Sequence, residues 1–187
     1  MDKLVFDVET KNTFGQVGGE GSIHKLDISF VGAYSYNRGE YLSFFEDDLP
    51  RLGSLLQKTG LLIGFSSNRF DIPVLSKYFP FNIKRIQSFD LLEELELATG
   101  RRISLDELAK VNLGVGKTGH GLDAIKLFRE GRLEELKAYC LNDVRITKDL
   151  YEKAGRNGFL LIPDRWSGTM KRVAFSVPAV VFPATLF

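Results

Sequence analysis

Two acidic side chains near the start of the chain lie at a spacing that could support metal chemistry. Asp7 and Glu9 fall within the segment 3–10, whose apolar residues favour a β-strand. Because side chains alternate between the faces of a strand, these two carboxylates share one face. Adjacent carboxylates repel each other unless one takes up a proton or a cation lies between them. The pair therefore indicates a divalent metal site, and the alternative is a strand with one solvated acidic face.

Two further acids could join this pair. Asp71 follows the apolar run 61–65, where a strand is expected to end and a helix to begin. A carboxylate there could also serve only to stabilise the helix N-terminus. Asp143 lies four residues after Tyr139 on the expected helix 133–153, so both side chains share one face of that helix. The alternatives for these two are a solvated charge and a tyrosine at the edge of the core.

The type of metal follows from the ligands that the chain offers. Carboxylate oxygens are hard ligands, which suit Mg²⁺ or Mn²⁺. The chain has only two histidines, His24 and His120, and a single cysteine, Cys140. This set does not form a zinc site, and we expect both histidines to lie in loops.

The elements that must position these residues alternate between strands and helices. The first three strands are predicted to be antiparallel, and the fourth to run parallel to the first through a helical crossover. Strands are expected at 3–10, 28–36, 41–45, 61–65, 86–89 and 159–162, and helices at 49–58, 73–79, 91–98, 105–111, 122–129 and 133–153. This order predicts an α/β domain with a mixed central sheet flanked by helices.

Several connecting segments carry recognisable signals. The glycine-containing stretch 11–26 is predicted to be a flexible loop beside the acids. Asp90 is predicted to cap the helix 91–98, and Ser104 the helix 105–111. The stretch 114–119 has the letters of a dinucleotide-binding fingerprint, but it follows a helix where that motif requires a strand. We interpret it as a mobile loop.

Length and composition set the broad class. With 187 residues we expect one domain, at 1–165, followed by an apolar tail at 166–187 that packs on the domain or mediates association with itself or a protein partner. The net charge of +1 excludes a global basic field, so nucleic-acid binding would depend on local groups. The single cysteine, and the lack of a signal peptide or membrane-spanning stretch, predict a cytoplasmic protein.

Three motifs, in order, resemble those of the DEDD 3′-5′ exonucleases. They are 6–10 (FDVET), 64–71 (GFSSNRFD) and 139–143 (YCLND). The resemblance covers residues 1–153 and is strongest to the branch related to the proofreading domain of family-B DNA polymerases. It implies a ribonuclease H-like fold. Tyr139 resembles the tyrosine of the DEDDy subclass, whereas Ser66 stands where relatives often carry asparagine, so a substrate contact is expected to differ there.

The resemblance also implies roles for the residues. Asp7, Glu9 and Asp143 would bind one Mg²⁺ or Mn²⁺ ion, and Asp7 would bridge to a second ion held by Asp71. Tyr139 would orient the attacking water. Candidates for contact with the substrate are Thr10, Lys11, Asn68, Phe70 and Lys117.

The function implied is metal-dependent 3′-5′ hydrolysis of phosphodiester bonds at the ends of single-stranded DNA, by a two-metal mechanism. The residues alone predict phosphodiester hydrolysis, while the direction of digestion and the preference for DNA over RNA come from the resemblance. A ribonuclease that trims RNA 3′ ends and a catalytically silent nucleic-acid-binding module are the alternatives.

Overall fold

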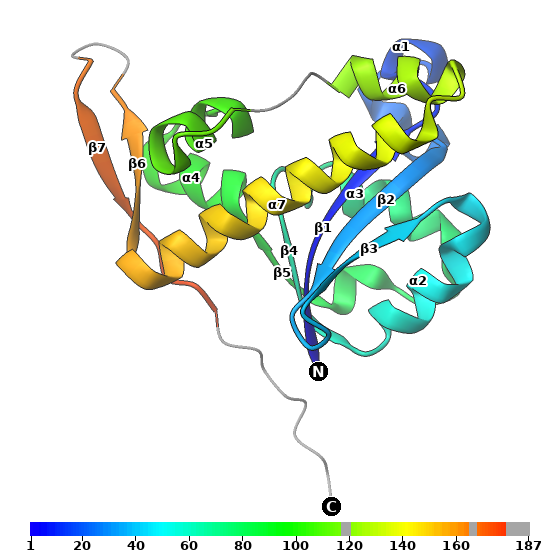
Figure 1. Ribbon diagram of the computed structural model, residues 1–187, viewed down its shortest axis with the longest axis horizontal. Helices are drawn as coiled ribbons and strands as arrows, with labels where there is room; N and C mark the ends of the chain where they lie inside the picture. The colour runs from blue at the N-terminus through cyan, green and yellow to red at the C-terminus, as the bar shows by residue number, and fades with distance from the viewer. Residues whose placement is uncertain (117–120, 165–167, 179–187) are drawn as a thin grey trace, which may run out of the picture.

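The computed structural model describes residues 1–116, 121–164 and 168–178 (Figure 1). Its centre is a five-stranded sheet in the order β3-β2-β1-β4-β5. Pairing is antiparallel between β1, β2 and β3, and parallel between β1, β4 and β5. The strands are β1 Asp2–Thr10, β2 Ile28–Ser35, β3 Glu40–Phe44, β4 Thr59–Gly64 and β5 Gln87–Asp90. The predicted mixed α/β sheet is confirmed.

Helices cover both faces of this sheet. The α-helices are α1 Phe14–Val17, α2 Leu49–Leu56, α3 Asp71–Leu75, α4 Leu91–Thr99, α5 Leu105–Leu113, α6 Gly121–Arg129 and α7 Leu133–Asn157. The long helix α7 crosses one face of the sheet diagonally (Figure 1). A Cβ atom at Gly32 of β2 would come within 3.0 Å of the Cys140 Sγ. The absence of a side chain at this position therefore lets α7 lie close against β2.

The alternation of side chains along β1 divides the core between the two faces. Val5 packs with buried residues of α4, α5 and α7. Leu4, Phe6 and Val8 pack instead with buried residues of α2 and α3. Because Asp7 and Glu9 alternate with Phe6 and Val8, the period of the strand places both acids on the α7 face.

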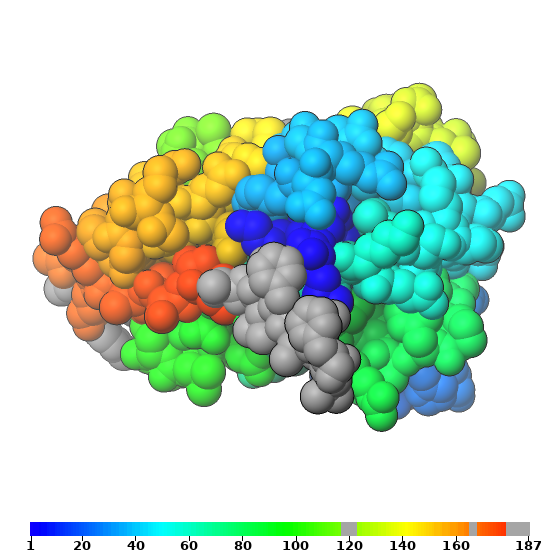
Figure 2. Space-filling model, turned by 90° about the horizontal axis from the view of Figure 1, so that it is seen from below, coloured from blue at the N-terminus to red at the C-terminus, as the bar shows by residue number. Residues whose placement is uncertain are grey.

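The two ends of β1 have different surroundings. Its N-terminal end reaches the surface between the β2–β3 hairpin, α2 and β7 (Figure 2). The acids lie toward its other end. Because β1 and β4 are parallel, their carboxyl ends meet at the same edge of the sheet, so the residues that follow β4 come close to Glu9. This edge is where open α/β sheets commonly bind ligands.

The stretch 11–26 was predicted to be a flexible loop, and the structure corrects this. It contains α1 and a 3₁₀ segment at Glu20–Lys25. A capping box begins α1: the Gln16 backbone N–H donates to the Thr13 Oγ1, and the Thr13 backbone N–H donates to the Gln16 Oε1 at 3.0 Å. The sequence-based prediction gave weight to the glycines of this stretch and missed the capping box of Thr13 and Gln16, which begins α1.

The expected strand 159–162 is one half of a hairpin. β6 Phe159–Pro163 pairs with β7 Met170–Ala174 in a separate two-stranded sheet. The Asn112 side chain pairs with β6, donating to the Leu161 carbonyl at 2.7 Å and accepting from the Leu161 N–H at 2.8 Å. Val173 and Phe175 are buried in the core. The first part of the predicted tail thus packs on the domain, while the boundary at residue 165 stays a prediction.

Within the described ranges, no helix has the length and apolar character needed to cross a membrane. The longest of them, α7, carries charged residues along its length and packs against the sheet.

The expected cap of α4 is confirmed, since the Asp90 Oδ1 accepts from the backbone N–H groups of Leu92 and Glu93.

Candidate active site

One pocket of about 490 Å³ lies at the carboxyl end of β1. Its lining combines residues from β1, from the connection that follows β1, from the segment after β4, and from α6 and α7. All of the residues predicted to carry chemistry line it, namely Asp7, Glu9, Asp71, Tyr139 and Asp143. Three motifs that are far apart in the sequence therefore meet around one space.

Asp71 is positioned directly against β1. It opens α3, and its Oδ1 accepts a hydrogen bond of 2.7 Å from the backbone N–H of Val8. Burial raises the pKa of this carboxyl well above its usual range, and the nearby Asp7 raises it further. The Val8 hydrogen bond lowers this pKa but does not reverse the shift. The two carboxylates are therefore close enough to repel when no cation lies between them.

The helix α7 supplies the other wall of the pocket. Tyr139 and Asp143 are both buried, one helical turn apart. The pKa of the Tyr139 phenol is raised by burial, and then by the neighbouring carboxylates Glu9 and Asp143. Its hydroxyl therefore keeps its proton at neutral pH and remains a hydrogen-bond donor.

Cys140, which the sequence showed only as the single cysteine of the chain, also lies against the acids of the site. Its thiol donates to Asp7, with the Sγ 3.4 Å from the Oδ2 and 3.5 Å from the backbone carbonyl oxygen. Burial raises the thiol pKa, and the charge of Asp7 raises it further, so the sulfur stays protonated. The signal was available in the sequence, since Cys140 lies between Tyr139 and Asp143 on the helix.

The donor set fits a hard divalent cation. Ligand atoms of Asp7, Glu9 and Cys140 lie within 4.8 Å of one another. Asp71 and Asp143 line the same pocket. Carboxylate oxygens outnumber the single protonated thiol, which makes the site better suited to a hard divalent cation than to a soft metal.

The predicted substrate contacts are only partly brought to this pocket. Thr10 and Phe70 line it, and Phe70 packs edge-to-face against Phe14, with ring centroids 5.8 Å apart. The Asn68 side chain is turned to Glu93, and its backbone N–H donates to the Asp90 Oδ2 at 2.9 Å. Asn68 therefore supports the loop rather than facing the pocket.

Of the two predicted lysines, Lys11 is described by the structure, and it is not brought to the acids. The Lys11 ammonium forms an ion pair of 2.5 Å with Glu46 and lies 5.5 Å from the centroid of the Phe128 ring. It lines a different pocket, together with residues of the β3–α2 connection. Lys117 lies outside the described residues.

Several pocket residues were not singled out from the sequence. Asn12, Thr13 and Phe14 come from the connection after β1, and Ile125 from α6. Their position directly after Thr10 was the available signal for the first three. Ile125 carries no such signal, because its approach to β1 depends on how α6 packs.

Comparison with known proteins identifies the family. A sequence model of the RNase_H superfamily matches residues 4–155 of the chain. The chain belongs to the RNase H superfamily. This confirms the predicted ribonuclease H-like fold. A search of curated protein sequences gives no significant match to this RNase H-like chain.

Solved structures with this RNase H-like fold include polymerases and nucleases. The family-B DNA polymerase of the hyperthermophilic archaeon Pyrobaculum calidifontis matches with a TM-score of 0.64 and 19% identity, over 82% of this chain and 24% of the polymerase. A structure of exonuclease I matches with a TM-score of 0.57 and 16% identity, over 83% and 41% of the two chains. A zinc-bound complex of E. coli ExoI with single-stranded DNA gives a TM-score of 0.57 and 15% identity, over 83% and 40%. The chain thus spans less than half the length of these proteins.

Proposed function

We propose that the protein is a metal-dependent 3′-5′ exonuclease that hydrolyses phosphodiester bonds at the ends of single-stranded DNA. The observation that carries this proposal is the meeting of Asp7, Glu9, Asp71, Tyr139 and Asp143 in one pocket. Membership of the RNase H superfamily and the fold shared with a family-B polymerase and exonuclease I support it. The direction of digestion and the choice of DNA are proposed by analogy with these proteins.

The carboxylates would hold the metal ions. We assign Asp7, Glu9 and Asp143 to one Mg²⁺ or Mn²⁺ ion, and Asp7 together with Asp71 to a second. When bound, the ions supply positive charge that activates water and stabilises the leaving 3′ oxygen. Burial raises the pKa of Asp71 in the metal-free protein, and repulsion from Asp7 raises it further; such cations would relieve this repulsion.

The remaining pocket residues have roles that do not depend on charge. The protonated Tyr139 hydroxyl is a donor and acceptor that would hold the attacking water in line with the phosphorus. Phe14 and Phe70 form an apolar wall on which the terminal base or sugar would lie. The Thr10 hydroxyl, which donates to the Asn12 carbonyl at 2.9 Å, still offers an acceptor toward the pocket.

Digestion of end-labelled oligonucleotides tests this proposal. A 5′-labelled single-stranded DNA should shorten stepwise from its 3′ end in Mg²⁺ or Mn²⁺, with release of mononucleotides, and EDTA should stop the reaction. A 3′-labelled copy should lose its label in the first step. Cleavage that begins at the 5′ end, or that persists in EDTA, contradicts the proposal.

A pair of acid substitutions on one helix provides the control. Asp143→Asn should abolish digestion because it removes a proposed metal ligand. Asp149→Asn also changes an aspartate of α7, but Asp149 forms surface ion pairs with Arg145 and Lys148 and does not line the pocket. It should digest DNA at the parent rate. Parent-like activity of both variants would show that Asp143 is not needed for the reaction.

The same assay separates the alternative functions. An RNA oligonucleotide of identical sequence, digested faster than the DNA, would identify a 3′-end-trimming ribonuclease. If the protein binds the DNA and the RNA oligonucleotide but shortens neither of them in Mg²⁺ or Mn²⁺, it is a catalytically silent binding module.

A further inference from the structure

The loop that joins β4 to α3 forms one rim of the pocket. Phe65 and Ser66 of this loop line the pocket itself. Among the described residues other than glycine, Ser66 is the one with a positive φ, at 65°. Non-glycine residues adopt this conformation only when their surroundings enforce it. The rim is therefore held in a defined shape.

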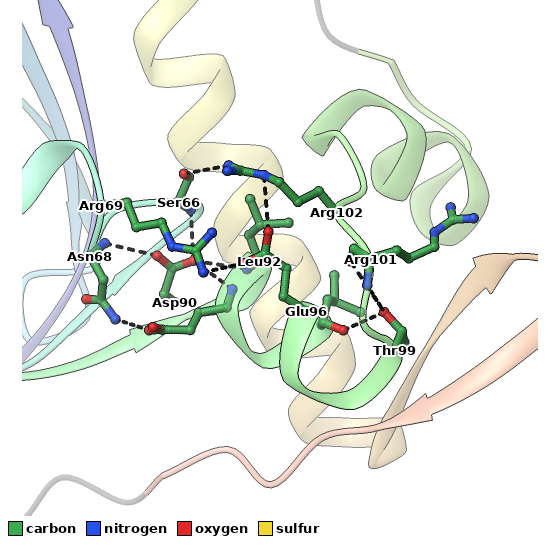
Figure 3. Close-up of polar contacts among 11 residues, drawn as sticks. Ser66, Asn68, Arg69, Asp90, Leu92, Glu96, Thr99, Arg101 and Arg102 are labelled. Atoms are coloured by element: carbon green, nitrogen blue, oxygen red, sulfur yellow. Dashed lines mark hydrogen bonds and ion pairs between the residues drawn. The ribbon is translucent and has the colours of Figure 1, made fainter. Parts of the chain in front are cut away.

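Asp90 enforces that shape from beneath (Figure 3). Its Oδ1 accepts from the Ser66 N–H at 2.8 Å, and its Oδ2 accepts from the Asn68 N–H at 2.9 Å. The same side chain caps α4. Because Asp90 is buried and its charge is met by these backbone donors, it ties the rim rigidly to the start of α4.

Two arginines meet beside this rim through one shared acid, Glu96 (Figure 3). The Arg69 Nη2 lies 2.5 Å from the Glu96 Oε2, and the Arg102 Nε lies 3.2 Å from the Glu96 Oε1. The Arg102 Nη2 also donates to the Ser66 Oγ at 3.3 Å. The guanidinium of Arg102 thus reaches the residue that lines the pocket.

The exposed guanidiniums of this cluster keep unused N–H donors with which they can bind an anion. The Glu96 side chain is 15% exposed, whereas those of Arg69 and Arg102 are 52% and 60% exposed. Glu96 lies between the two guanidiniums, and Glu93 and Asp90 also lie near Arg69. Asp90 accepts from the backbone N–H groups of Ser66 and Asn68, and Glu93 accepts from the Asn68 amide. Each guanidinium carries five N–H donors, and the bonds to Glu96 and Ser66 use a minority of them. A fixed, exposed pair of guanidiniums suits the geometry of a phosphate group.

We infer that Arg69 and Arg102 form a clamp for a backbone phosphate of the nucleic-acid strand, upstream of the 3′-terminal nucleotide. The identity of the ligand as a single strand rests on the proposed function. If the terminal nucleotide occupies the pocket, the rest of the strand must leave across a rim, and Arg69 and Arg102 lie at the rim formed by Ser66. Contacts to phosphate position a strand without reading its sequence.

Binding of a single-stranded oligonucleotide tests the clamp apart from cleavage. Fluorescence anisotropy with 5′-fluorescein dT8 in Mg²⁺ would be measured in the Asp143→Asn background, so that the probe stays intact. The double variant Arg69→Gln/Arg102→Gln should bind dT8 at least tenfold more weakly at low salt. The slope of log K against log salt should fall by about 0.7 for each phosphate that the variant no longer binds. Affinity for thymidine 5′-monophosphate, which occupies only the pocket, should not change.

Two variants separate direct phosphate binding from a structural effect. Arg101→Gln is the matched control, because Arg101 pairs with Glu107 and points away from Ser66 (Figure 3). It should bind dT8 as the background protein does. Arg102→Lys should keep the salt slope of the background protein, and its affinity for dT8 should lie between those of the background protein and the double variant. The lysine keeps the positive charge but lacks the planar guanidinium. Weaker binding of the monophosphate by the double variant would indicate damage to the pocket and count against the clamp.

The outcomes that contradict the clamp are different from those that contradict the proposed function. Unchanged dT8 affinity and salt slope in the double variant overturn the clamp, even where the parent protein digests DNA. An equal loss of affinity in Arg101→Gln also overturns it, as does a failure of the background protein to bind dT8. Weakened binding by the double variant alone, in a chain that never cleaves, supports the clamp and refutes the nuclease.

Discussion

Replacing Asp71 by asparagine should stabilise the metal-free protein while it abolishes activity. The substitution keeps the shape of the side chain and an oxygen that accepts from the Val8 N–H, whose bond to Asp71 is 2.7 Å. It removes a buried ionisable group whose pKa is raised by burial and by Asp7. We expect a gain of about 1–3 kcal/mol in the free energy of unfolding at pH 7, the range for an incompletely compensated buried polar group. The melting temperature should rise by roughly 2–4 °C for each kcal/mol.

The dependence of this gain on pH follows from the direction of the pKa shift. In the parent, the folded state binds the Asp71 proton more tightly than the unfolded state does. The parent therefore gains stability as pH falls through the raised pKa of the folded state, until the ordinary carboxyl pKa is reached. The advantage of Asp71→Asn should be largest at neutral pH and should shrink progressively as the solution is acidified.

Urea denaturation in EDTA, at a series of pH values, measures this effect. Asp149→Asn on α7 is the control, since Asp149 is a partly exposed surface acid, and it should change stability by less than about 0.5 kcal/mol. With saturating Mg²⁺ the order should reverse, because a metal that binds only the folded parent stabilises it. A loss of stability for Asp71→Asn at pH 7 in EDTA would refute the electrostatic argument.

Three further predictions concern other parts of the chain. Tyr139→Phe should slow single-turnover cleavage in saturating Mn²⁺ by a factor on the order of 10 to 1,000, the range for one positioned hydrogen-bonding group; a parent-like rate would make Tyr139 a packing residue. Asn112→Ala should lower the urea stability by about 1–3 kcal/mol, because it leaves the Leu161 backbone unpaired; unchanged stability would contradict this. A chain that ends at residue 178 keeps the buried Phe175 and should form smaller oligomers than the full chain, as measured by light scattering. The same number of subunits and the same solubility would contradict association through the tail.

The sequence by itself determined the five strands of the central sheet, most of the helices and the catalytic candidates, because these depend on short-range patterns, whereas α1 and β7 were not predicted. Strand alternation placed Asp7 and Glu9 on one face of β1, and helical periodicity paired Tyr139 with Asp143. The cap at Asp90 was equally local, since its acceptor lies next to the donors of α4. Where glycines dominated the pattern, at 11–26, the local signal was misread.

Only the tertiary structure decided which side chains face the pocket and which are engaged elsewhere. Lys11 pairs with Glu46, which is 35 residues away in the chain, although its sequence position next to Thr10 suggested a substrate contact. Asp90 braces Ser66 in addition to capping α4. Arg69 lies in the β4–α3 connection and Arg102 in the α4–α5 connection, and they meet through Glu96.

The physical reason for this division is the range of the forces involved. Backbone periodicity and capping act within a few residues, so they can be read from the order of the amino acids. Ion pairs, and the desolvation that raises the pKa of Asp71, depend on the distance between segments that the packing of α7 and the parallel pairing of β1 and β4 bring together. The sequence determined the candidates for catalysis, and the packing of the chain decided which of them share one pocket.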